Sequence, residues 1–292
     1  MSQIASSPKT RLAVAGLLLG GVAIGGSPIF VRLSEVGPLA TAFWRVFLAL
    51  FPFFLMSRLA KDGDEQPSGL RDYALLMLPG VFLAIDLVAW HLSLHMTSVA
   101  NATLLANLAP VFVTLGSWLL FGARITPVFL TGLALALIGI VVLKGGPQAI
   151  GGEQLAGDAT AVTAAVFYAG YMLALGHLRS RCSAPRTLVW ATLSATVCML
   201  PIAIVFEGNL MPATLYGWAM LAGLAFITHA GGQGLFTYAL AYLPTAFSAL
   251  TLLLQPVVAA LLAWALLSEP IGAMQAVGGL IILAGILIAR RG

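Results

Sequence analysis

Long apolar runs dominate the chain, and short polar breaks separate them. Each run is close to the roughly 20 residues that a helix needs to cross the hydrocarbon core of a bilayer. The runs are continuous rather than alternating, which favours helices over a β-barrel. The pattern predicts an all-α integral membrane protein with ten transmembrane helices at residues 12–31, 38–57, 73–94, 98–121, 127–143, 158–177, 187–206, 214–240, 245–267 and 271–289.

The breaks between the runs carry turn-forming residues, as in Ser34–Pro38, Lys61–Glu65 and Ser268–Pro270. All of them are short, which leaves no room for a soluble catalytic domain. Lys9 and Arg11 precede the first run, as basic residues precede the apolar core of a signal peptide. Because this run is as long as a span and further spans follow it, we expect an uncleaved first helix.

Composition agrees with a membrane environment. The 292 residues are 60% hydrophobic and 8% charged, and the mean hydropathy is +1.02, whereas soluble domains are about 25% charged. The net charge is +4. The basic residues flank apolar runs and do not form a stripe interleaved with aromatic residues, so nucleic-acid binding is not expected.

The basic residues also predict the orientation. With ten spans, eleven of the fourteen Lys and Arg residues fall on the side that holds both ends of the chain. Arg32 and Lys144 fall on the other side, and Arg45 lies inside a span. Cytoplasmic loops are enriched in Lys and Arg. We therefore expect both termini in the cytoplasm and a multi-pass protein of the bacterial inner membrane.

The two halves of the chain repeat each other. With a shift of 146 residues, several rare residue types align without a gap. The aligned pairs are Trp44 with Trp190, Pro110 with Pro256, Trp118 with Trp264, Gly132 with Gly278, and Gly139 with Gly285. The shift predicts two five-helix repeats, residues 1–146 and 147–292. Because five is odd, the second repeat enters the membrane inverted, as in secondary transporters that work by alternating access; a duplication that only builds a stable bundle is the alternative.

Three segments carry a family resemblance: Phe43-Trp44-Arg45, the stretch Thr97–Leu143, and its counterpart Leu243–Ala289. In these segments the chain resembles the ten-helix drug/metabolite transporter superfamily of the EamA type. The resemblance covers the whole chain and implies a transporter. One departure is Gly122-Ala123, where the family often has Gly-Glu; we interpret that Glu as a turn cap. More narrowly, the chain is similar to YddG-type bacterial exporters of aromatic amino acids.

Two charged residues lie deep in predicted spans, Arg45 in the second and Asp86 in the third. A charge that faces lipid at mid-depth costs at least ~3 kcal/mol, so such residues face the protein interior or a cavity. Three roles stay open for Arg45: snorkelling to the interface, a structural or gating pair with Asp86, and binding of a substrate carboxylate. The resemblance favours the structural or gating role, since relatives with different substrates share an arginine here.

Uncharged polar and aromatic residues form a second set of candidates. Within a bilayer such groups must find partners or face water. Stripes from several helices are expected to line a substrate cavity, although hydrogen bonding between helices is equally consistent with each residue. The cavity candidates are Trp90, His91, Asn101, Tyr168, Tyr171, His229, Gln233 and Gln255. The repeat-related Pro110 and Pro256 are hinge candidates, because proline breaks helical hydrogen bonding.

The sequence offers little for other chemistry. The four histidines and the two cysteines match no metal-site spacing, and no phosphate-binding loop is present. We expect no catalytic residues, metal or cofactor, and a small-molecule substrate and membrane lipid as partners. The oligomeric state is left open, since glycine-rich faces at the first and last helices suit either internal packing or a dimer.

The expected function is export of small amphipathic metabolites, most of all aromatic and other neutral amino acids. Movement is expected to be gradient-driven without obligatory proton coupling, because only one deep carboxylate exists. One rival is a drug or organic-cation exporter that depends on Asp86. A rival of another class is an intramembrane enzyme built on Asp86 and His91, which are five residues apart and so do not share a helical face.

Overall fold

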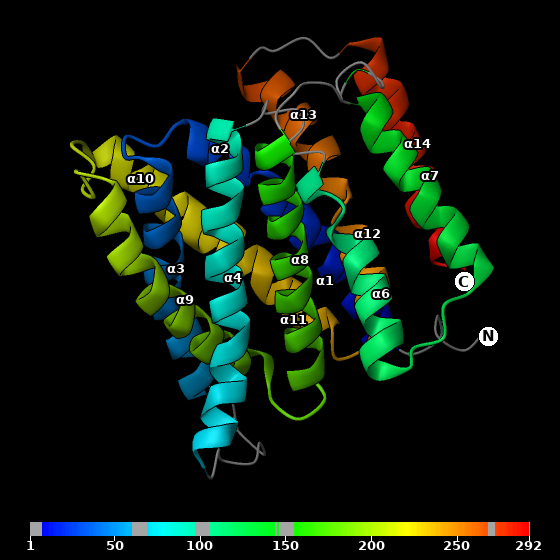
Figure 1. Ribbon diagram of the computed structural model, residues 1–292, viewed down its shortest axis with the longest axis horizontal. Coiled ribbons are helices and arrows are strands. Elements are labelled where there is room, and N and C mark those ends of the chain that lie inside the picture. The colour runs from blue at the N-terminus through cyan, green and yellow to red at the C-terminus, as the bar shows by residue number, and fades with distance from the viewer. Residues whose placement is uncertain are drawn as a thin grey trace.

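The computed structural model describes residues 8–59, 69–96, 105–143, 145, 155–267 and 272–291, and every regular element in these ranges is a helix (Figure 1). The first half contains α1 (Pro8–Gly25), α2 (Ser27–Arg32), α3 (Pro38–Leu59), α4 (Leu70–Met96), α6 (Ala109–Phe121) and α7 (Pro127–Leu143). The second half contains α8 (Leu155–Leu178), α9 (Ala184–Phe206), α10 (Leu215–Gly223), η2 (Leu224–Gln233), α11 (Gly234–Ala239), α12 (Thr245–Thr251), α13 (Leu254–Leu267) and α14 (Ala273–Ala289).

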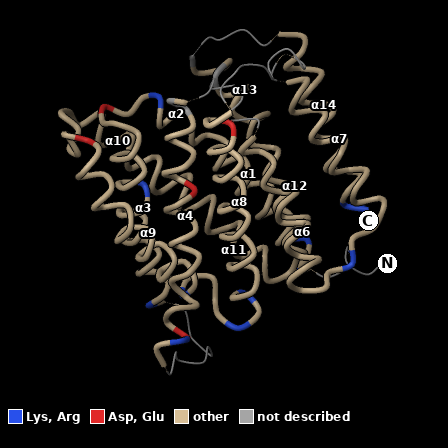
Figure 2. Tube along the Cα trace, viewed as in Figure 1, with Lys and Arg blue, Asp and Glu red and all other residues tan. Residues whose placement is uncertain are grey.

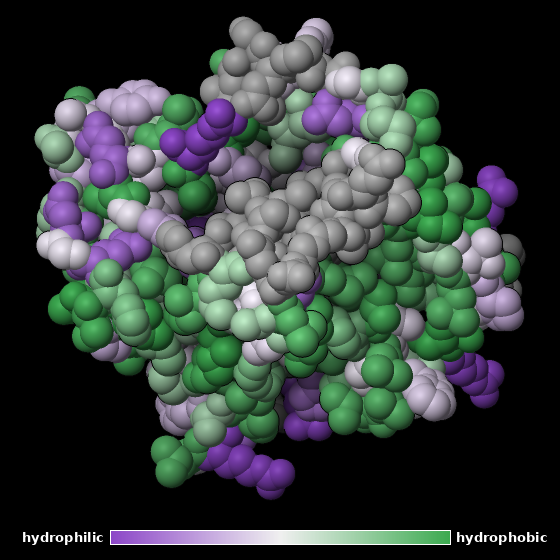
Figure 3. Space-filling view, turned by 45° about the horizontal axis from the view of Figure 1, so that its top comes forward, coloured by the Kyte–Doolittle hydropathy of each residue, from purple (hydrophilic) through white to green (hydrophobic). Residues whose placement is uncertain are grey.

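Seven helical segments among the described residues are long and apolar enough to cross a membrane. Three shorter apolar helices, α6, α7 and α14, accompany them. Large hydrophobic side chains are exposed along these helices, and hydrophobic residues cover the flanks of the molecule in Figure 3. Charged residues gather at the helix ends, and a few lie inside the bundle (Figure 2). The chain is therefore a multi-pass membrane protein.

Most predicted helix positions are confirmed. The helices α3, α4, α7, α8, α9 and α14 each lie within three residues of a predicted span. The predicted run 12–31 is divided into α1 and α2 at Gly26, and 245–267 is divided into α12 and α13. The run 98–121 is described only from residue 105, and its regular helix α6 starts later than predicted, at Ala109.

Both repeat-related prolines follow a helix interruption. Residues 107 and 108 form a turn before Pro110, and residues 252 and 253 form a turn before Pro256. Proline has no N–H to donate, and its ring clashes with the carbonyl of the residue four positions earlier. Each turn lies within the four residues that precede the proline, and the carbonyl of the first of these residues would otherwise accept the missing hydrogen bond. Each helix is therefore interrupted just before its proline, and a hinge role for Pro110 and Pro256 stays a prediction.

The segment η2 is a ten-residue π-helix in the middle of the continuous helix Leu215–Ala239. Its sequence, LAFITHAGGQ, contains His229 and the pair Gly231-Gly232. A π-helix is wider than an α-helix and places successive side chains at different angles. Such segments are rare and occur often at functional sites. Two cavity candidates, His229 and Gln233, lie on this element.

Helices that correspond in the two halves pack against each other. The helix α7 lies along α14, and α3 lies along α9 (Figure 1). Both pairs run antiparallel: Gly132 approaches Gly285 while Leu143 approaches Gly278 in one pair, and the start of α3 meets Glu207 at the end of α9 in the other. The remaining large interfaces join α4 to α8 and to α9, and α1 to η2 and α11.

The α7–α14 interface is built on small residues. A Cβ added to Gly139 would lie 2.7 Å from the Ile282 nitrogen, and one added to Gly285 would lie 2.7 Å from the Ala136 nitrogen. Only glycine allows the two backbones to approach so closely. The four glycines Gly132, Gly139, Gly278 and Gly285 are two repeat-related pairs, so both helices supply equivalent contacts.

The α3–α9 pair is held by polar contacts at one end. The Glu207 carboxylate accepts hydrogen bonds from the backbone N–H groups of Leu39 at 2.6 Å and Ala40 at 2.8 Å. These groups lie at the start of α3, where a helix leaves N–H groups without internal partners and favours negative charge. Trp44 Nε1 also donates to the Leu210 carbonyl at 2.6 Å. The carboxylate therefore caps α3 from the opposite half of the chain.

Candidate functional site

Arg45 on α3 and Asp86 on α4 interact electrostatically inside the bundle. Both side chains are half-buried. The Arg45–Asp86 pair considered from the sequence stays a prediction. Two opposite charges that lie near each other inside the bundle mark a candidate site for a ligand that carries both charges.

Two tyrosines of α8 lie beside these charges. Arg45 and Asp86 both interact electrostatically with Tyr168 and with Tyr171. The two tyrosine rings are stacked, with centroids 5.9 Å apart and an interplanar angle of 21°. Tyr168 interacts through its hydroxyl with Gln255 on α13. Tyr171 is fully buried, whereas Tyr168 is half-buried.

The π-helix contributes the deepest polar groups. His229 is 2% exposed and Gln233 is 3% exposed. Both His229 ring nitrogens and Gln233 Nε2 have no hydrogen-bond partner among the described residues. The His229 ring contacts Phe53 of α3 at 5.9 Å between centroids, and Gln233 interacts with the Tyr171 hydroxyl. Buried polar groups without partners are uncommon in native proteins and indicate a place where a ligand or water binds.

The structure therefore brings seven predicted residues together from both halves of the chain. They are Arg45, Asp86, Tyr168, Tyr171, His229, Gln233 and Gln255, and we call this set the central cluster. A small cavity of about 30 Å³ beside Tyr168 and Gln255 extends to Pro110. Its volume suits about one water molecule rather than an organic substrate. Arg45, Asp86, Tyr168 and Gln255 are half-buried and form the accessible part of the cluster.

Three cavity candidates are not placed in the central cluster. Trp90 lies one helical turn after Asp86 on α4, and its ring contacts His91 at 4.9 Å between centroids. His91 is buried and hydrogen-bonds through Nδ1 with the Leu87 carbonyl of its own helix. Asn101 lies outside the described residues. A role for Trp90, His91 and Asn101 in the cavity stays a prediction.

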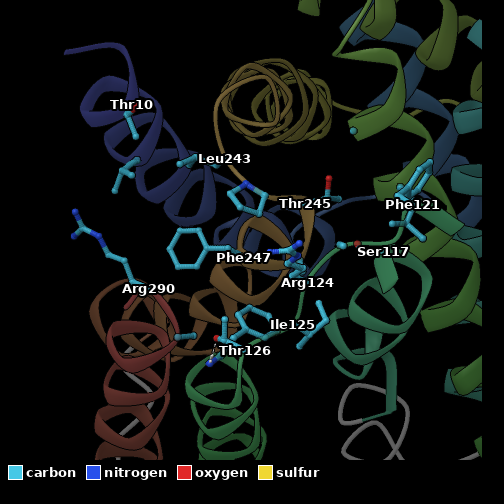
Figure 4. Close-up of a pocket in the computed structure, with 18 of the residues that line it drawn as sticks. Thr10, Ser117, Phe121, Arg124, Ile125, Thr126, Leu243, Thr245, Phe247 and Arg290 are labelled. Atoms are coloured by element: carbon cyan, nitrogen blue, oxygen red, sulfur yellow. Dashed lines mark hydrogen bonds between the residues drawn. The ribbon is translucent and has the colours of Figure 1, made fainter. Parts of the chain in front are cut away.

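A second hollow was not anticipated from the sequence. It has a volume of about 520 Å³ and lies at the end of the bundle where α1 begins and α14 ends (Figure 4). Gly122 ends α6 in the left-handed conformation, with φ of 62°, and turns the chain so that Arg124 lines the hollow. We call this hollow the arginine pocket, because Arg11, Arg124, Arg290 and Arg291 line it. These arginines are far apart in sequence, so only the folded chain reveals the pocket.

The comparison with known families is decisive for the class of protein. The EamA-like transporter family matches residues 11–144 and, a second time, residues 155–291. Together the two matches cover most of the chain. The chain belongs to the EamA-like transporter family. The resemblance found from the three sequence segments is confirmed, and the EamA assignment indicates a transporter rather than an enzyme.

Relatives of this EamA protein include named exporters. A protein of Archaeoglobus fulgidus described as an uncharacterized transporter is 28% identical over 96% of this chain and 97% of its own length. The pseudopaline exporter of Pseudomonas aeruginosa is 28% identical over 74% of this chain and 75% of its own. A protein of Streptantibioticus cattleyicolor, described as "Probable terminal-alkyne amino-acid exporter", is 30% identical over 65% of this chain and 64% of its own length.

The fold of this EamA protein is also found among solved structures. One crystal structure matches with a TM-score of 0.77 and covers 96% of both chains. The sequence identity is 19%, so this similarity concerns the fold. The helical architecture described above is therefore the architecture of a known protein fold across almost the entire chain.

Proposed function

We propose that this EamA protein exports amino acids, with aromatic and other neutral amino acids as its main substrates. The observation that carries the proposal is the juxtaposition of Arg45 and Asp86, two opposite charges that interact electrostatically inside the bundle. An amino acid carries a carboxylate and an ammonium group on one carbon. Arg45 supplies a bidentate donor for the carboxylate, and Asp86 supplies an acceptor for the ammonium group. No cofactor is needed for this recognition.

The neighbouring tyrosines support an aromatic or apolar side chain. Stacked aromatic rings such as Tyr168 and Tyr171 offer a flat surface on which another ring packs favourably. Gln255 lies beside the Tyr168 hydroxyl and Gln233 beside the Tyr171 hydroxyl. A substrate bound with its charged end at Arg45 and Asp86 would extend its side chain over this surface. The amino-acid exporter among the relatives agrees with this class of substrate.

The proposed mechanism is alternating access between two inverted repeats, residues 1–146 and 147–292. The support is the antiparallel packing of α7 on α14 and of α3 on α9, because inverted repeats place corresponding helices in opposite directions. Counting α6, α7 and α14 as spans gives ten crossings with both termini in the cytoplasm. The distribution of basic residues supports this orientation and the bacterial inner membrane.

A drug or organic-cation exporter is the second candidate. Asp86 is the observation that favours it, since a carboxylate inside the bundle attracts a cationic ligand. Arg45 argues against it, because the nearby guanidinium repels a ligand that carries only positive charge. The two candidates therefore differ in whether the substrate must carry a carboxylate.

Counterflow in proteoliposomes separates the candidates. Vesicles that contain the purified protein are loaded with unlabelled phenylalanine, phenylalanine amide or methyl viologen, and uptake of labelled phenylalanine is followed. We expect stimulation by internal phenylalanine and none by the amide, which keeps the ring and the ammonium group but lacks the carboxylate. Stimulation by methyl viologen alone would replace amino-acid export with cation export, and the absence of any stimulation would reject both substrates.

A further inference from the structure

The arginine pocket has a charged mouth. Arg124 follows the end of α6, and Arg290 and Arg291 follow the end of α14; all three are exposed. Arg11, near the start of α1, is a fourth basic lining residue. No acidic residue lies among the described residues that line the pocket. Four like charges around one opening create a strongly positive potential that attracts anions.

Much of the wall of the same pocket is apolar, although hydroxyl groups such as those of Ser117 and Thr245 also line it. Phe129, Leu173, Leu243 and Phe247 form the apolar part, and in Figure 4 Phe247 and Arg124 project into the same space. At one side of the pocket the Phe121 ring stacks on His177, with centroids 5.6 Å apart. A pocket for a small inorganic anion would be polar throughout. Positive charge over apolar walls instead matches a molecule with an anionic head and a hydrocarbon body.

The location of the pocket favours a lipid as that molecule. The pocket lies between the α7–α14 pair and the ends of α6, α8 and α12, at the end of the bundle that holds Thr10 and Arg290 (Figure 4). Helix ends of a membrane protein lie near the level of the lipid head groups. Phe121, Val128 and Leu130, on or beside its walls, are exposed as lipid-facing residues are. Basic pockets between transmembrane helices at this level are suited to anionic head groups.

We propose that the arginine pocket binds one anionic phospholipid. Its phosphate lies at Arg124 and Arg290, and the part of the acyl chain next to the head group lies on Phe247 and Leu173. The lipid fills the space between the α7–α14 pair and the rest of the bundle. This inference uses the membrane-spanning character of the chain and is independent of the substrate proposed above. It assigns to the pocket a ligand other than the transported molecule.

Lipid binding to the full-length protein in detergent tests the proposal. Phosphatidylglycerol and phosphatidylcholine with identical acyl chains are titrated in turn, and bound lipid is counted by native mass spectrometry. We expect phosphatidylglycerol to bind at least tenfold more tightly than phosphatidylcholine. The double variant Arg124→Gln/Arg290→Gln should lower its affinity by roughly 30-fold, since each basic residue near the membrane contributes about fivefold.

Matched variants separate charge from folding. The control Arg58→Gln/Arg181→Gln removes two exposed arginines that lie at the same end of the bundle but outside the pocket. Its affinity for phosphatidylglycerol should equal that of the wild type. Arg124→Lys/Arg290→Lys keeps the charge and should retain most of the binding. Ala123→Trp fills the pocket without changing charge and should weaken binding of both lipids.

Three results would overturn the proposal. Equal affinity for the two lipids would show that the head-group charge is not recognised. Wild-type affinity in Arg124→Gln/Arg290→Gln would place the lipid elsewhere. If the double variant kept its lipid affinity and instead raised the KM for phenylalanine counterflow in phosphatidylcholine vesicles, the pocket would serve the soluble substrate. Because lipid binding is measured without substrate, a failure of the amino-acid proposal leaves this test unaffected.

Discussion

The α7–α14 pair and the α3–α9 pair each join a helix to the helix 146 residues later in the sequence, yet different forces hold them. The bounds of α7, shifted by 146, are those of α14. Glycines at equivalent positions bring these two backbones together, and the helices carry no charge. The α3–α9 pair instead depends on the Glu207 carboxylate at the end of α9 and on Trp44, which donates to the Leu210 carbonyl just beyond it.

The difference shows which residues recur between the two halves of the chain and which do not. Glycine and proline recur in both halves at 132 and 278, 139 and 285, and 110 and 256. None of the central cluster recurs: Arg45 corresponds to Ala191, and Asp86 corresponds to Gly232. Close backbone packing is needed in both halves, because each half must pack its helices without a hydrophobic force between them. A ligand site needs one set of charges, so equivalence between the halves is lost there.

The largest expected effect comes from breaking the glycine pair. In Gly139→Leu the new Cβ would meet the α14 backbone at 2.7 Å, and backbone cannot move aside without separating the helices. We expect a loss of about 3 kcal/mol in the free energy of unfolding, seen as a low yield of monodisperse protein and a lower Tm in detergent. Gly208→Leu is the control, because a Cβ there meets nothing within 4 Å. An unchanged Tm in Gly139→Leu would contradict the packing described.

The next effect concerns the charges of the central cluster. Arg45→Gln and Asp86→Asn each leave the other charge inside the bundle without its neighbour. We expect each to lower kcat/KM for phenylalanine counterflow more than about 100-fold, while Arg58→Gln stays within twofold of the wild type. Retained transport in both variants, with normal folding confirmed by gel filtration, would remove Arg45 and Asp86 from substrate recognition.

A smaller effect is expected at the end of the α3–α9 pair. Glu207→Ala removes the acceptor of two backbone N–H groups at the start of α3. Hydrogen bonds to a charged group contribute about 1.5–3 kcal/mol, so we expect a loss near 2 kcal/mol and a lower Tm. Glu207→Gln keeps one acceptor oxygen, so its Tm should lie between those of the wild type and Glu207→Ala. If Glu207→Ala melts at the wild-type temperature, the two halves are not tied together by this carboxylate.

The smallest effect is a pH dependence at the same end. Hydrogen bonds from Thr214, which donates its hydroxyl and its backbone N–H, lower the pKa of Glu35 below its ordinary value of 4.5. A carboxyl whose pKa is lowered by folding stabilises the folded state above that ordinary value and loses this contribution as the pH falls through the lowered pKa. The Tm difference between wild type and Glu35→Gln should therefore be constant from pH 7 to 5 and shrink below about pH 4.5. A Tm difference that grows on acidification would contradict the lowered pKa of Glu35.

Much of the fold was determined by the sequence alone. The length of an apolar run sets a helix, so six helices lie within three residues of their predicted ranges. The matched glycines and prolines predicted two repeats, residues 1–146 and 147–292, and these bounds stay a prediction. The seven residues of the central cluster were also chosen from the sequence, because a polar group in a bilayer must find a partner or face water; their common role in a substrate site stays a prediction.

Only the tertiary structure decided which of those residues meet and how. Periodicity within one helix places Trp90 near Asp86, but it does not show that the His91 ring binds its own backbone. The π-helix that carries His229 and Gln233 arises in a segment whose composition is that of an ordinary span. The arginine pocket needs residues from the start of the chain, its middle and its end. Local sequence determines where each helix runs, whereas contacts between distant segments depend on how the helices pack against one another.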